Sequence, residues 1–155
     1  MTGDAKRQLV DDLMLKVTQL QDVSDQVDQA VSDRLGLNRT DARCLSCLII
    51  KGSMTAGELA AAAVVTPTAL TFVIDRLVRA GYAQRVRDPA DRRRVLVEAA
   101  EPARRFAEEV WGEVVVETEQ QLEKYATRDL QLILGFLSDQ VELQQRHAGR
   151  IRKRS

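Results

Sequence analysis

Apolar side chains return at every third or fourth position along most of the chain, which is the spacing of one face of an α-helix. Residues 6–35 carry the longest such run and predict one long helix that ends at Gly36. The apolar positions of this helix are Leu9, Leu13, Val17, Leu20, Val23, Val27 and Val31. A second run follows Asn38, whose side chain suits a helix N-cap, and predicts a helix that continues to about Lys51.

Two shorter helices are predicted next in the chain. Thr55 and Glu58 have the spacing of a capping box, in which each side chain bonds the other residue's backbone N–H. Thr66 and Pro67 supply a second cap, with proline at the first helical position, and Gly81 marks the end of that helix. Two helices joined by a turn of about three or four residues form a helix-turn-helix.

The pattern then changes to two short strand-like runs, 82–87 and 95–97, on either side of the turn-forming residues 88–91. These runs predict a β-hairpin, the wing, whose loop is rich in arginine and able to enter a DNA minor groove. The arginines of the hairpin are Arg85, Arg87, Arg92, Arg93 and Arg94. Asp91 is expected to support the wing by holding Arg93 in a bidentate ion pair. A solvated charged hairpin is the alternative.

Two more helices are predicted after the wing, the first of them opening near Pro102. The fold class is therefore mainly α with a small β-hairpin wing: a winged helix-turn-helix flanked by N- and C-terminal helices. We expect residues 1–155 to form a single domain, with the winged helix-turn-helix lobe at 38–100 and dimerisation elements at 6–35 and 102–147. The apolar faces of those elements are too long for one small lobe to cover, so pairing with a second copy would bury them.

Composition and charge narrow the class of protein. With 45% hydrophobic and 30% charged residues, the chain has the composition of a soluble globular protein. It shows no signal peptide and no apolar stretch near the roughly 18 residues of a membrane span, so we expect a cytoplasmic protein without a membrane partner. The formal net charge of zero hides a division: 76–105 hold nine basic and four acidic residues, whereas 106–145 hold two basic and nine acidic ones. DNA affinity depends on a local basic segment rather than on the average.

The second helix of a helix-turn-helix enters the major groove with its N-terminal residues nearest the bases. Hydroxyl groups there bond bases or phosphates, and threonine methyl groups contact thymine, although solvated helix surface is the alternative. The candidate DNA-binding residues are Thr55, Thr66, Pro67, Thr68, Thr71, Phe72, Arg76, Arg92, Arg93 and Arg94.

Four motifs carry a family resemblance: TAGELA at 55–60, TPTALTFVIDRL at 66–77, RAGY at 79–82 and, most specifically, DPADRRRVLV at 88–97. With these motifs, the helix order and the length, the chain resembles the MarR family of transcriptional regulators over nearly its whole extent. The resemblance implies a homodimer whose first and last helices interlock, and two winged domains on a near-palindromic operator of double-stranded DNA. It also implies a ligand pocket or a redox switch between the dimerisation helices and the DNA-reading lobe.

Within this resemblance, Arg76 belongs to a closing Asp-Arg-Leu motif and would hold either a phosphate or, as we favour, a structural ion pair. Two positions depart from the family pattern. Phe72 stands where many members carry a polar or basic residue, so base recognition would depend on apolar contact or on the wing. Ala99 and Ala100 replace a common Leu-Thr cap, a loss that costs on the order of 1 kcal/mol and allows the start of the next helix to shift by a turn.

Other candidate chemistry is weaker. Cys44 and Cys47 fall inside a predicted helix, where buried small apolar side chains are the default, although an oxidant-sensing role stays open. His147 is the only histidine, too isolated for a metal site. We find no phosphate-binding loop, nucleophile triad or paired carboxylates, and therefore predict no metal, no cofactor and no enzyme activity.

The predicted function is a DNA-binding transcriptional regulator, a repressor relieved by a small phenolic or drug-like effector. Gln19, Arg43 and Trp111 are weak candidates for lining an effector pocket, and for Trp111 plain packing is the alternative. Two further functions stay open: a constitutive or redox-switched DNA binder, and a winged-helix protein-interaction module that has lost DNA binding.

Overall fold

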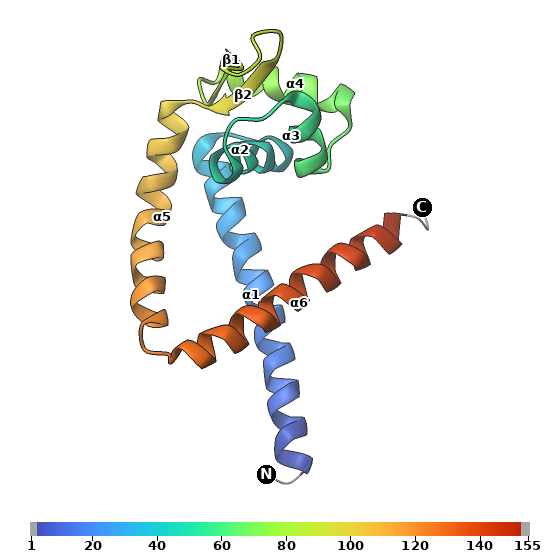
Figure 1. The fold of residues 1–155 in the computed structure, drawn as a ribbon, viewed down its shortest axis with the longest axis vertical. Coiled ribbons are helices and arrows are strands. Elements are labelled where there is room, and N and C mark those ends of the chain that lie inside the picture. Colours follow the sequence, from blue (N-terminus) through green and yellow to red (C-terminus); the bar gives the residue numbers. More distant parts are fainter. Residues whose placement is uncertain (1–2, 153–155) are drawn as a thin grey trace. The chain divides into compact units, whose positions relative to one another are not determined.

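The computed structural model describes residues 3–152, and the helices and strands follow the predicted order (Figure 1). The elements are α1 (Gly3–Leu35), α2 (Arg39–Lys51), α3 (Ala56–Ala63), α4 (Pro67–Arg79), β1 (Ala83–Arg87), β2 (Val95–Ala99), α5 (Glu101–Leu122) and α6 (Thr127–Arg152). The fold class is therefore confirmed as mainly helical with one antiparallel hairpin. The chain divides into two compact units after Ala107, and each is considered by itself.

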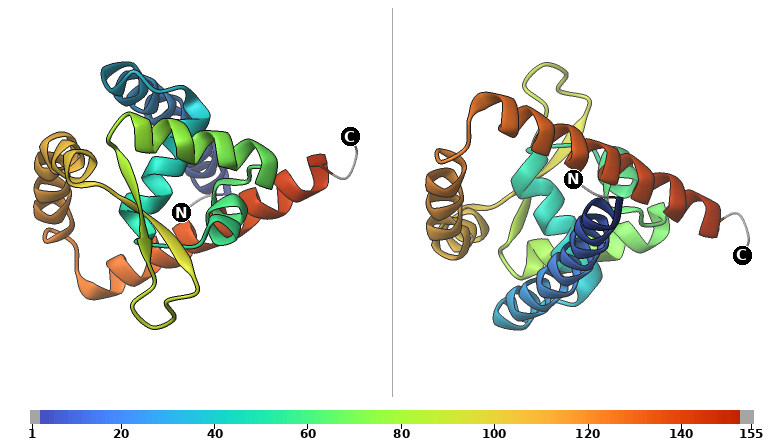
Figure 2. Two further views of the ribbon diagram at one scale, coloured as in Figure 1. Left: turned by 90° about the horizontal axis from the view of Figure 1, so that it is seen from above. Right: turned by 90° about the horizontal axis from the view of Figure 1, so that it is seen from below.

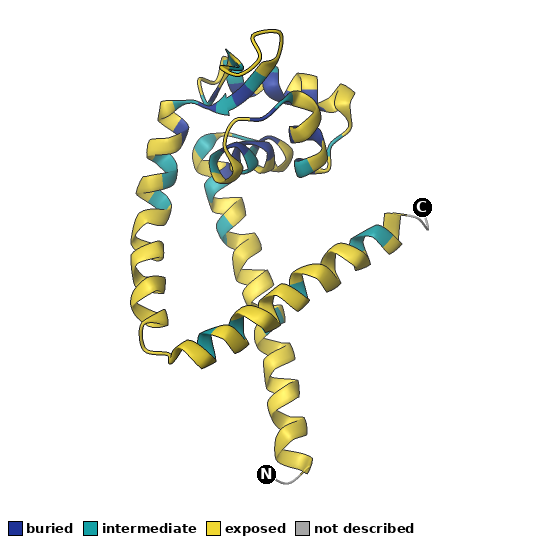
Figure 3. Cartoon of the chain, viewed as in Figure 1, coloured by how far each residue is buried: buried dark blue, intermediate teal, exposed yellow. Residues whose placement is uncertain are grey.

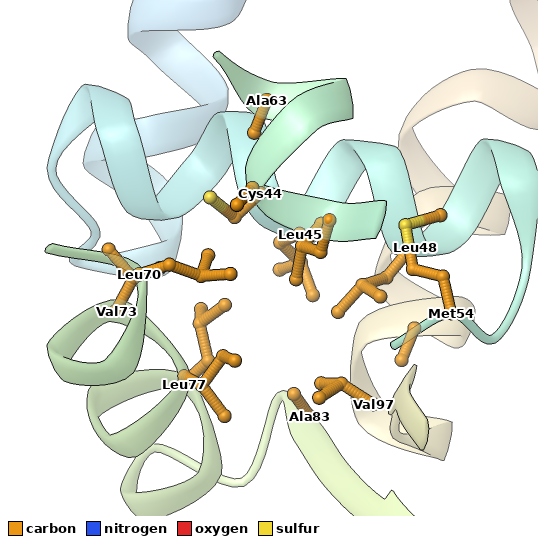
Figure 4. Close-up of a cluster of buried hydrophobic side chains, with 14 of the residues drawn as sticks. Cys44, Leu45, Leu48, Met54, Ala63, Leu70, Val73, Leu77, Ala83 and Val97 are labelled. Carbon is orange, nitrogen blue, oxygen red and sulfur yellow. The ribbon is translucent and has the colours of Figure 1, made fainter. Parts of the chain in front are cut away.

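The winged lobe, formed by α2, α3, α4 and the β1–β2 hairpin, contains the hydrophobic core of the first unit. Leucine side chains from all three helices meet there with less than 3% of their surface exposed: Leu45, Leu48, Leu59, Leu70 and Leu77. In Figure 4, Leu45 and Leu48 of α2 point toward Leu70 and Leu77 of α4, and Ala83 and Val97 of the hairpin close one side of this core. The core thus fixes both the recognition helix α4 and the base of the wing.

The hairpin is attached to the lobe by an additional backbone bridge. β1 and β2 pair in antiparallel register, with Arg85 opposite Val97. Met54, just before α3, adds a further pairing: its N–H donates to the carbonyl of Val97 at 3.1 Å and its carbonyl accepts from the N–H of Val97 at 2.8 Å. The loop that joins the two strands projects beyond the helices of the lobe in both views of Figure 2.

The turn of the helix-turn-helix is three residues long, from the end of α3 at Ala63 to the start of α4 at Pro67, and the two helices are bent by 104°. Val64 opens this turn in the left-handed conformation, with φ 55° and ψ 50°. Its N–H donates to the carbonyl of Ala60, and the N–H of Val65 donates to the same carbonyl at 2.9 Å. Glycine is the usual residue at such a position because a Cβ crowds the backbone there.

The start of α5 lies close to the predicted position despite the missing hydroxyl cap. The helix begins at Glu101, and the carbonyl of Ala100 accepts from the N–H groups of Ala103 and Arg104 at 3.0 and 3.2 Å. Ala99 is only 1% exposed, so its small side chain serves the core while Ala100 opens the helix. The shift of a turn that the sequence allowed does not occur.

Three contacts join the C-terminal end of α1 to neighbouring elements of the first unit. The Tyr82 hydroxyl donates to the carbonyl of Leu35 at 3.4 Å, and Arg39 pairs with Asp25 at 3.0 Å. The guanidinium of Arg34 lies 5.1 Å from the centre of the Phe106 ring, within the range of a cation–π interaction. The long helix therefore meets the lobe through its last turns.

Most of α1, α5 and α6 is exposed in the single chain, whereas the buried residues concentrate in the lobe (Figure 3). The exposed side chains include many large apolar ones: on α1, Leu9, Leu13, Met14 and Leu20, and on α6, Leu132, Leu134, Leu137 and Val141. Among the described helices, none is by itself long and apolar enough to cross a membrane. α3 and α4 meet that test only together, as a bent pair.

Replacing Val64 with glycine is expected to stabilise the protein. The left-handed conformation strains a β-branched residue, and the Val64 side chain is 59% exposed, so little packing is lost. We expect Val64→Gly to raise the free energy of unfolding by about 1 kcal/mol, measured by urea denaturation. Val64→Ala is the control, since alanine keeps the Cβ; a glycine variant less stable than the alanine variant would contradict the strain.

Candidate nucleic-acid interface

A buried carboxylate sets the position of α4 against α2. Asp41, in the first turn of α2, is 2% exposed. The Nε and Nη2 atoms of Arg76 donate to its two carboxylate oxygens at 2.7 and 2.6 Å, a bidentate pair. This hydrogen bonding to Asp41 raises the pKa of the Arg76 guanidinium above its usual value. Of the two roles that the sequence left open for Arg76, the ion pair is the one that forms.

The N-terminal half of α4 turns its polar and small side chains outward, as predicted. Thr66 is the N-cap, and its Oγ1 accepts from the N–H of Ala69 at 3.3 Å. Pro67, Thr68, Thr71 and Phe72 are all exposed. Because Leu70, Val73, Ile74 and Leu77 occupy the core side, one continuous stripe of the recognition helix remains available to a partner.

The acidic side chain on this stripe is paired with a cation of the wing. Asp75 lies one turn after Thr71 and Phe72, where a free carboxylate would repel DNA phosphates. Arg85 of β1 donates to its Oδ1 at 2.6 Å. The pair fastens the wing to the recognition helix and neutralises the carboxylate. Arg85 therefore supports the interface, a role that its place among the wing arginines did not reveal.

The wing loop is organised by two aspartates. Asp88 Oδ1 accepts from the N–H of Ala90 at 2.8 Å, and Asp91 Oδ1 accepts from the N–H of Arg93 at 3.0 Å. The backbone closes the turn where the N–H of Arg94 donates to the carbonyl of Asp91 at 2.9 Å. Asp91 thus supports the wing, as predicted, but through the backbone. The expected bidentate pair between Asp91 and the Arg93 guanidinium is absent from the described residues, because the carboxylate bonds the nearer N–H instead.

The three consecutive arginines of the wing have different surroundings. The guanidinium of Arg94 lies 3.5 Å from Glu58 and 3.9 Å from Asp88, which ties the wing to the start of α3. Arg87 donates to the carbonyl of Arg92 at 3.2 Å. Across the described part of the chain, the guanidinium groups of Arg92 and Arg93 form no ion pair. These two exposed arginines are the free cations at the tip of the wing.

The Thr55 side chain is hydrogen-bonded within the capping box. Its Oγ1 accepts from the N–H of Glu58 at 3.3 Å, and Glu58 Oε2 accepts from both the N–H and the hydroxyl of Thr55 at 2.7 Å. These bonds to the backbone and the hydroxyl of Thr55 lower the pKa of Glu58. The ionised carboxylate is also the partner of Arg94, so the cap of α3 and the wing share one side chain.

Sequence reasoning missed several of the groups that position the interface. Glu98 of β2 accepts from Gln84 at 2.6 Å and from Ser53 at 2.9 Å, and these two hydrogen bonds lower its pKa. The pairs Asp75–Arg85 and Glu58–Arg94 were also missed. For Gln84 and Glu98 a signal existed, since they face each other across the hairpin.

The candidate effector residues do not gather into one site within the first unit. Gln19, on α1, accepts from Lys16 at 2.9 Å, and Arg43, on α2, is exposed. Trp111 belongs to the second unit. A hollow beside α1 is lined by Leu20, Gln21, Ser24 and Asp25 and includes none of the three. Their role as ligand contacts stays a prediction.

The two cysteines are free thiols in different surroundings. Cys44 lies in the core with none of its surface exposed, and Cys47 is half-buried beside it. Burial raises the pKa of the Cys44 thiol to about 11, and the nearby Cys47 and Asp41 add to the effect. At neutral pH this thiol is protonated and a poor nucleophile. Residues 3–152, which include His147, contain no group of three His, Cys, Asp or Glu side chains that could hold a metal ion.

A family model and a known protein both match this chain. Residues 37–95 match the family model described as "MarR family". The chain is 30% identical over 125 residues to YcgE of Bacillus subtilis (strain 168), an uncharacterized HTH-type transcriptional regulator, and the match covers 81% of each protein.

Solved structures share the fold. Wild-type MarR from E. coli, in the apo form, aligns with a TM-score of 0.53 at 26% identity, covering 83% of this chain and 95% of that one. NadR in complex with 4-hydroxyphenylacetate aligns with a TM-score of 0.58 at 20% identity, covering 81% of this chain and 89% of that one.

Removing Arg76 is expected to destabilise the lobe because it leaves the Asp41 carboxylate buried without its partner. We expect Arg76→Ala to lower the urea midpoint of unfolding, and the double variant Asp41→Asn/Arg76→Ala to recover part of the loss, since a neutral amide is less costly to bury than an unpaired carboxylate. Equal midpoints for the single and double variants would show that the unpaired carboxylate is not the cause of the loss, and equal midpoints for Arg76→Ala and the wild type would show that the ion pair does not stabilise the fold.

Proposed function

Because the chain belongs to the MarR family of transcriptional regulators, we propose that it is a cytoplasmic repressor that binds operator DNA as a homodimer and is released by a small-molecule effector. Membership of the family makes it a DNA-binding transcriptional regulator. The repression, the dimer, the effector and the residues that contact DNA are the parts proposed here.

The assignment of the DNA-binding residues rests on the distribution of charge on the lobe. Arg76, Arg85 and Arg94 have carboxylate partners within the protein, whereas Arg92 and Arg93 are unpaired at the tip of the wing. Unpaired guanidinium groups on a projecting loop suit the narrow, electronegative minor groove. Thr66, Pro67, Thr68, Thr71 and Phe72 are exposed on the adjacent helix, which suits the major groove.

The homodimer is supported by the exposed apolar side chains outside the lobe. Leu13 of α1 is 47% exposed, and Leu134 of α6 is 66% exposed. Large apolar side chains left exposed in such number along a helix are unfavourable in water and are usually covered by another subunit. A twofold pair would place two recognition helices about one turn of DNA apart, roughly 34 Å, on a near-palindromic operator.

The effector is supported by a structural neighbour. NadR, which has the same fold, is known in complex with 4-hydroxyphenylacetate, a phenolic acid. By analogy, a phenolic or drug-like molecule would bind this chain, with Gln19, Arg43 and Trp111 as candidate contacts. A cysteine switch is less well supported, because the buried Cys44 thiol with its pKa of about 11 is slow to react with oxidants.

Binding to duplex DNA tests the DNA-binding residues. We expect the protein to bind DNA from the region upstream of its own gene, with two chains per site and an affinity that falls steeply as salt rises. The double variant Arg92→Ala/Arg93→Ala is expected to weaken binding and to reduce the slope of log affinity against log salt by about four, because two arginines are lost from each of the two chains. Fluorescence anisotropy at several salt concentrations measures both quantities.

The matched control is Lys124→Ala/Arg128→Ala, which removes the same charge from the turn before α6 and the start of that helix. This variant is expected to bind DNA as the wild type does. An equal loss in both double variants would show that only net charge matters, and a salt-independent or absent interaction would reject DNA binding altogether.

Transcription in a purified system tests repression and its relief. We expect the protein to reduce transcription from a promoter that contains its binding site, because the bound dimer blocks the polymerase. A phenolic acid such as 4-hydroxyphenylacetate is expected to restore transcription and lower DNA affinity, while acetate, which lacks the ring, is the control. Increased transcription without any effector would contradict the repressor role.

A further inference from the structure

The exposed stripe of α4 lacks the side chains that usually read bases through hydrogen bonds. From Thr66 to Ile74 the sequence contains no Arg, Lys, Asn, Gln, Asp or Glu. Thr68 and Phe72 lie one turn apart on the outward stripe, and Phe72 is 61% exposed. A large aromatic ring therefore occupies the middle of the surface that a recognition helix presents to the major groove.

The hydroxyl groups on this surface are largely used within the helix. Thr66 Oγ1 accepts from the N–H of Ala69, and Thr71 Oγ1 donates to the carbonyl of Pro67 at 3.3 Å. Only the Thr68 hydroxyl is without a partner among the described residues of this half of the helix. What remains directed to solvent is mostly apolar: the methyl groups of the threonines and of Ala69, and the Phe72 ring.

The two charged residues that directly follow this half of the helix, Asp75 and Arg76, are also engaged. Asp75 is bound by Arg85 at 2.6 Å, and Arg76 holds Asp41 through Nε and Nη2, one edge of its guanidinium. Releasing either residue to bond a base would break an ion pair that positions the lobe. Base recognition by the N-terminal half of α4 therefore relies mainly on apolar contact, with Thr68 supplying the one hydroxyl that has no partner within the protein.

We propose that α4 reads thymine C5-methyl groups in the major groove, through Phe72 together with the methyl groups of Thr68, Ala69 and Thr71. This inference rests on the proposed DNA binding and specifies what the bound DNA contains. The thymine methyl is the apolar group on the base edges of the major groove. The amino and carbonyl groups of other bases would lose water against Phe72 without gaining a hydrogen bond, which selects against them.

The charge on the wing complements this apolar surface. Arg92 and Arg93 bind the electronegative minor groove of any sequence that narrows it, and A·T tracts narrow it most. The same A·T pairs place thymine methyl groups in the major groove. Wing and helix thus favour one class of DNA, duplexes with thymine-rich half-sites, through two different physical properties.

The test removes single methyl groups from the DNA. Duplexes that bind the wild-type protein are first selected from a library with a randomised centre, and deoxyuridine then replaces thymine at one half-site position at a time. At the contacted positions we expect affinity to fall about fourfold for each methyl group removed. Deoxyuridine outside the half-sites is the control and is expected to change nothing.

Protein variants identify the side chain that contacts the thymine methyl group. For Phe72→Ala we expect the ratio of the affinities for thymine and deoxyuridine duplexes to fall toward one at the position that faces the ring. For Phe72→Leu we expect part of the preference for thymine to remain. Thr68→Val keeps the methyl group and removes the hydroxyl, so it is expected to preserve the difference. Circular dichroism confirms that each variant folds, which the exposure of Phe72 favours.

The outcomes separate this inference from the function on which it depends. Equal affinity of the protein for the thymine and deoxyuridine forms of a selected duplex would overturn methyl recognition and leave DNA binding intact. A thymine preference unchanged in Phe72→Ala would overturn the role of the ring. Failure of the library to yield any salt-sensitive binder would reject the DNA-binding proposal itself.

Discussion

The buried carboxylate of Asp41 is the constraint on which the arrangement of the lobe depends. A charge that is 2% exposed must have a partner, and Arg76 supplies two hydrogen bonds at once. Because Arg76 lies on α4 and Asp41 on α2, the pair fixes the rotation of α4 about its axis. That rotation places Leu70 and Leu77 in the core and leaves Thr68 and Phe72 outside.

Ion pairs also decide which cations of the basic segment are available. Arg76, Arg85 and Arg94 are each bound to a carboxylate from another element, and Arg104 lies 3.9 Å from Glu98. These pairs use the charge of the segment to hold α2, α3, α4 and the hairpin together. Counting arginines therefore overestimates the number of phosphate contacts, and the geometry leaves Arg92 and Arg93 as the free pair at the wing tip.

The sequence predicted the local features well because their causes are local. Asn38, Thr55 and Thr66 each cap a helix by bonding an N–H two or three residues away, so the residue types alone reveal them. The partners of Asp41 and Glu58 could not be predicted in this way, since they lie 35 and 36 residues along the chain and several arginines were equally suitable. The left-handed turn at Val64 gave no sequence signal either, because glycine or asparagine is the usual residue there.

The division between wing and helix has a physical consequence for recognition. Arg92 and Arg93 displace counterions when they enter the minor groove, so their contribution falls as salt rises. Burial of methyl groups against Phe72 releases no ions, so the preference for one base over another does not depend on salt in the same way. A protein built like this would lose affinity in high salt while keeping its discrimination. The ion pairs of Asp75 and Arg76 contribute to that separation, because they engage the charged groups nearest to Phe72.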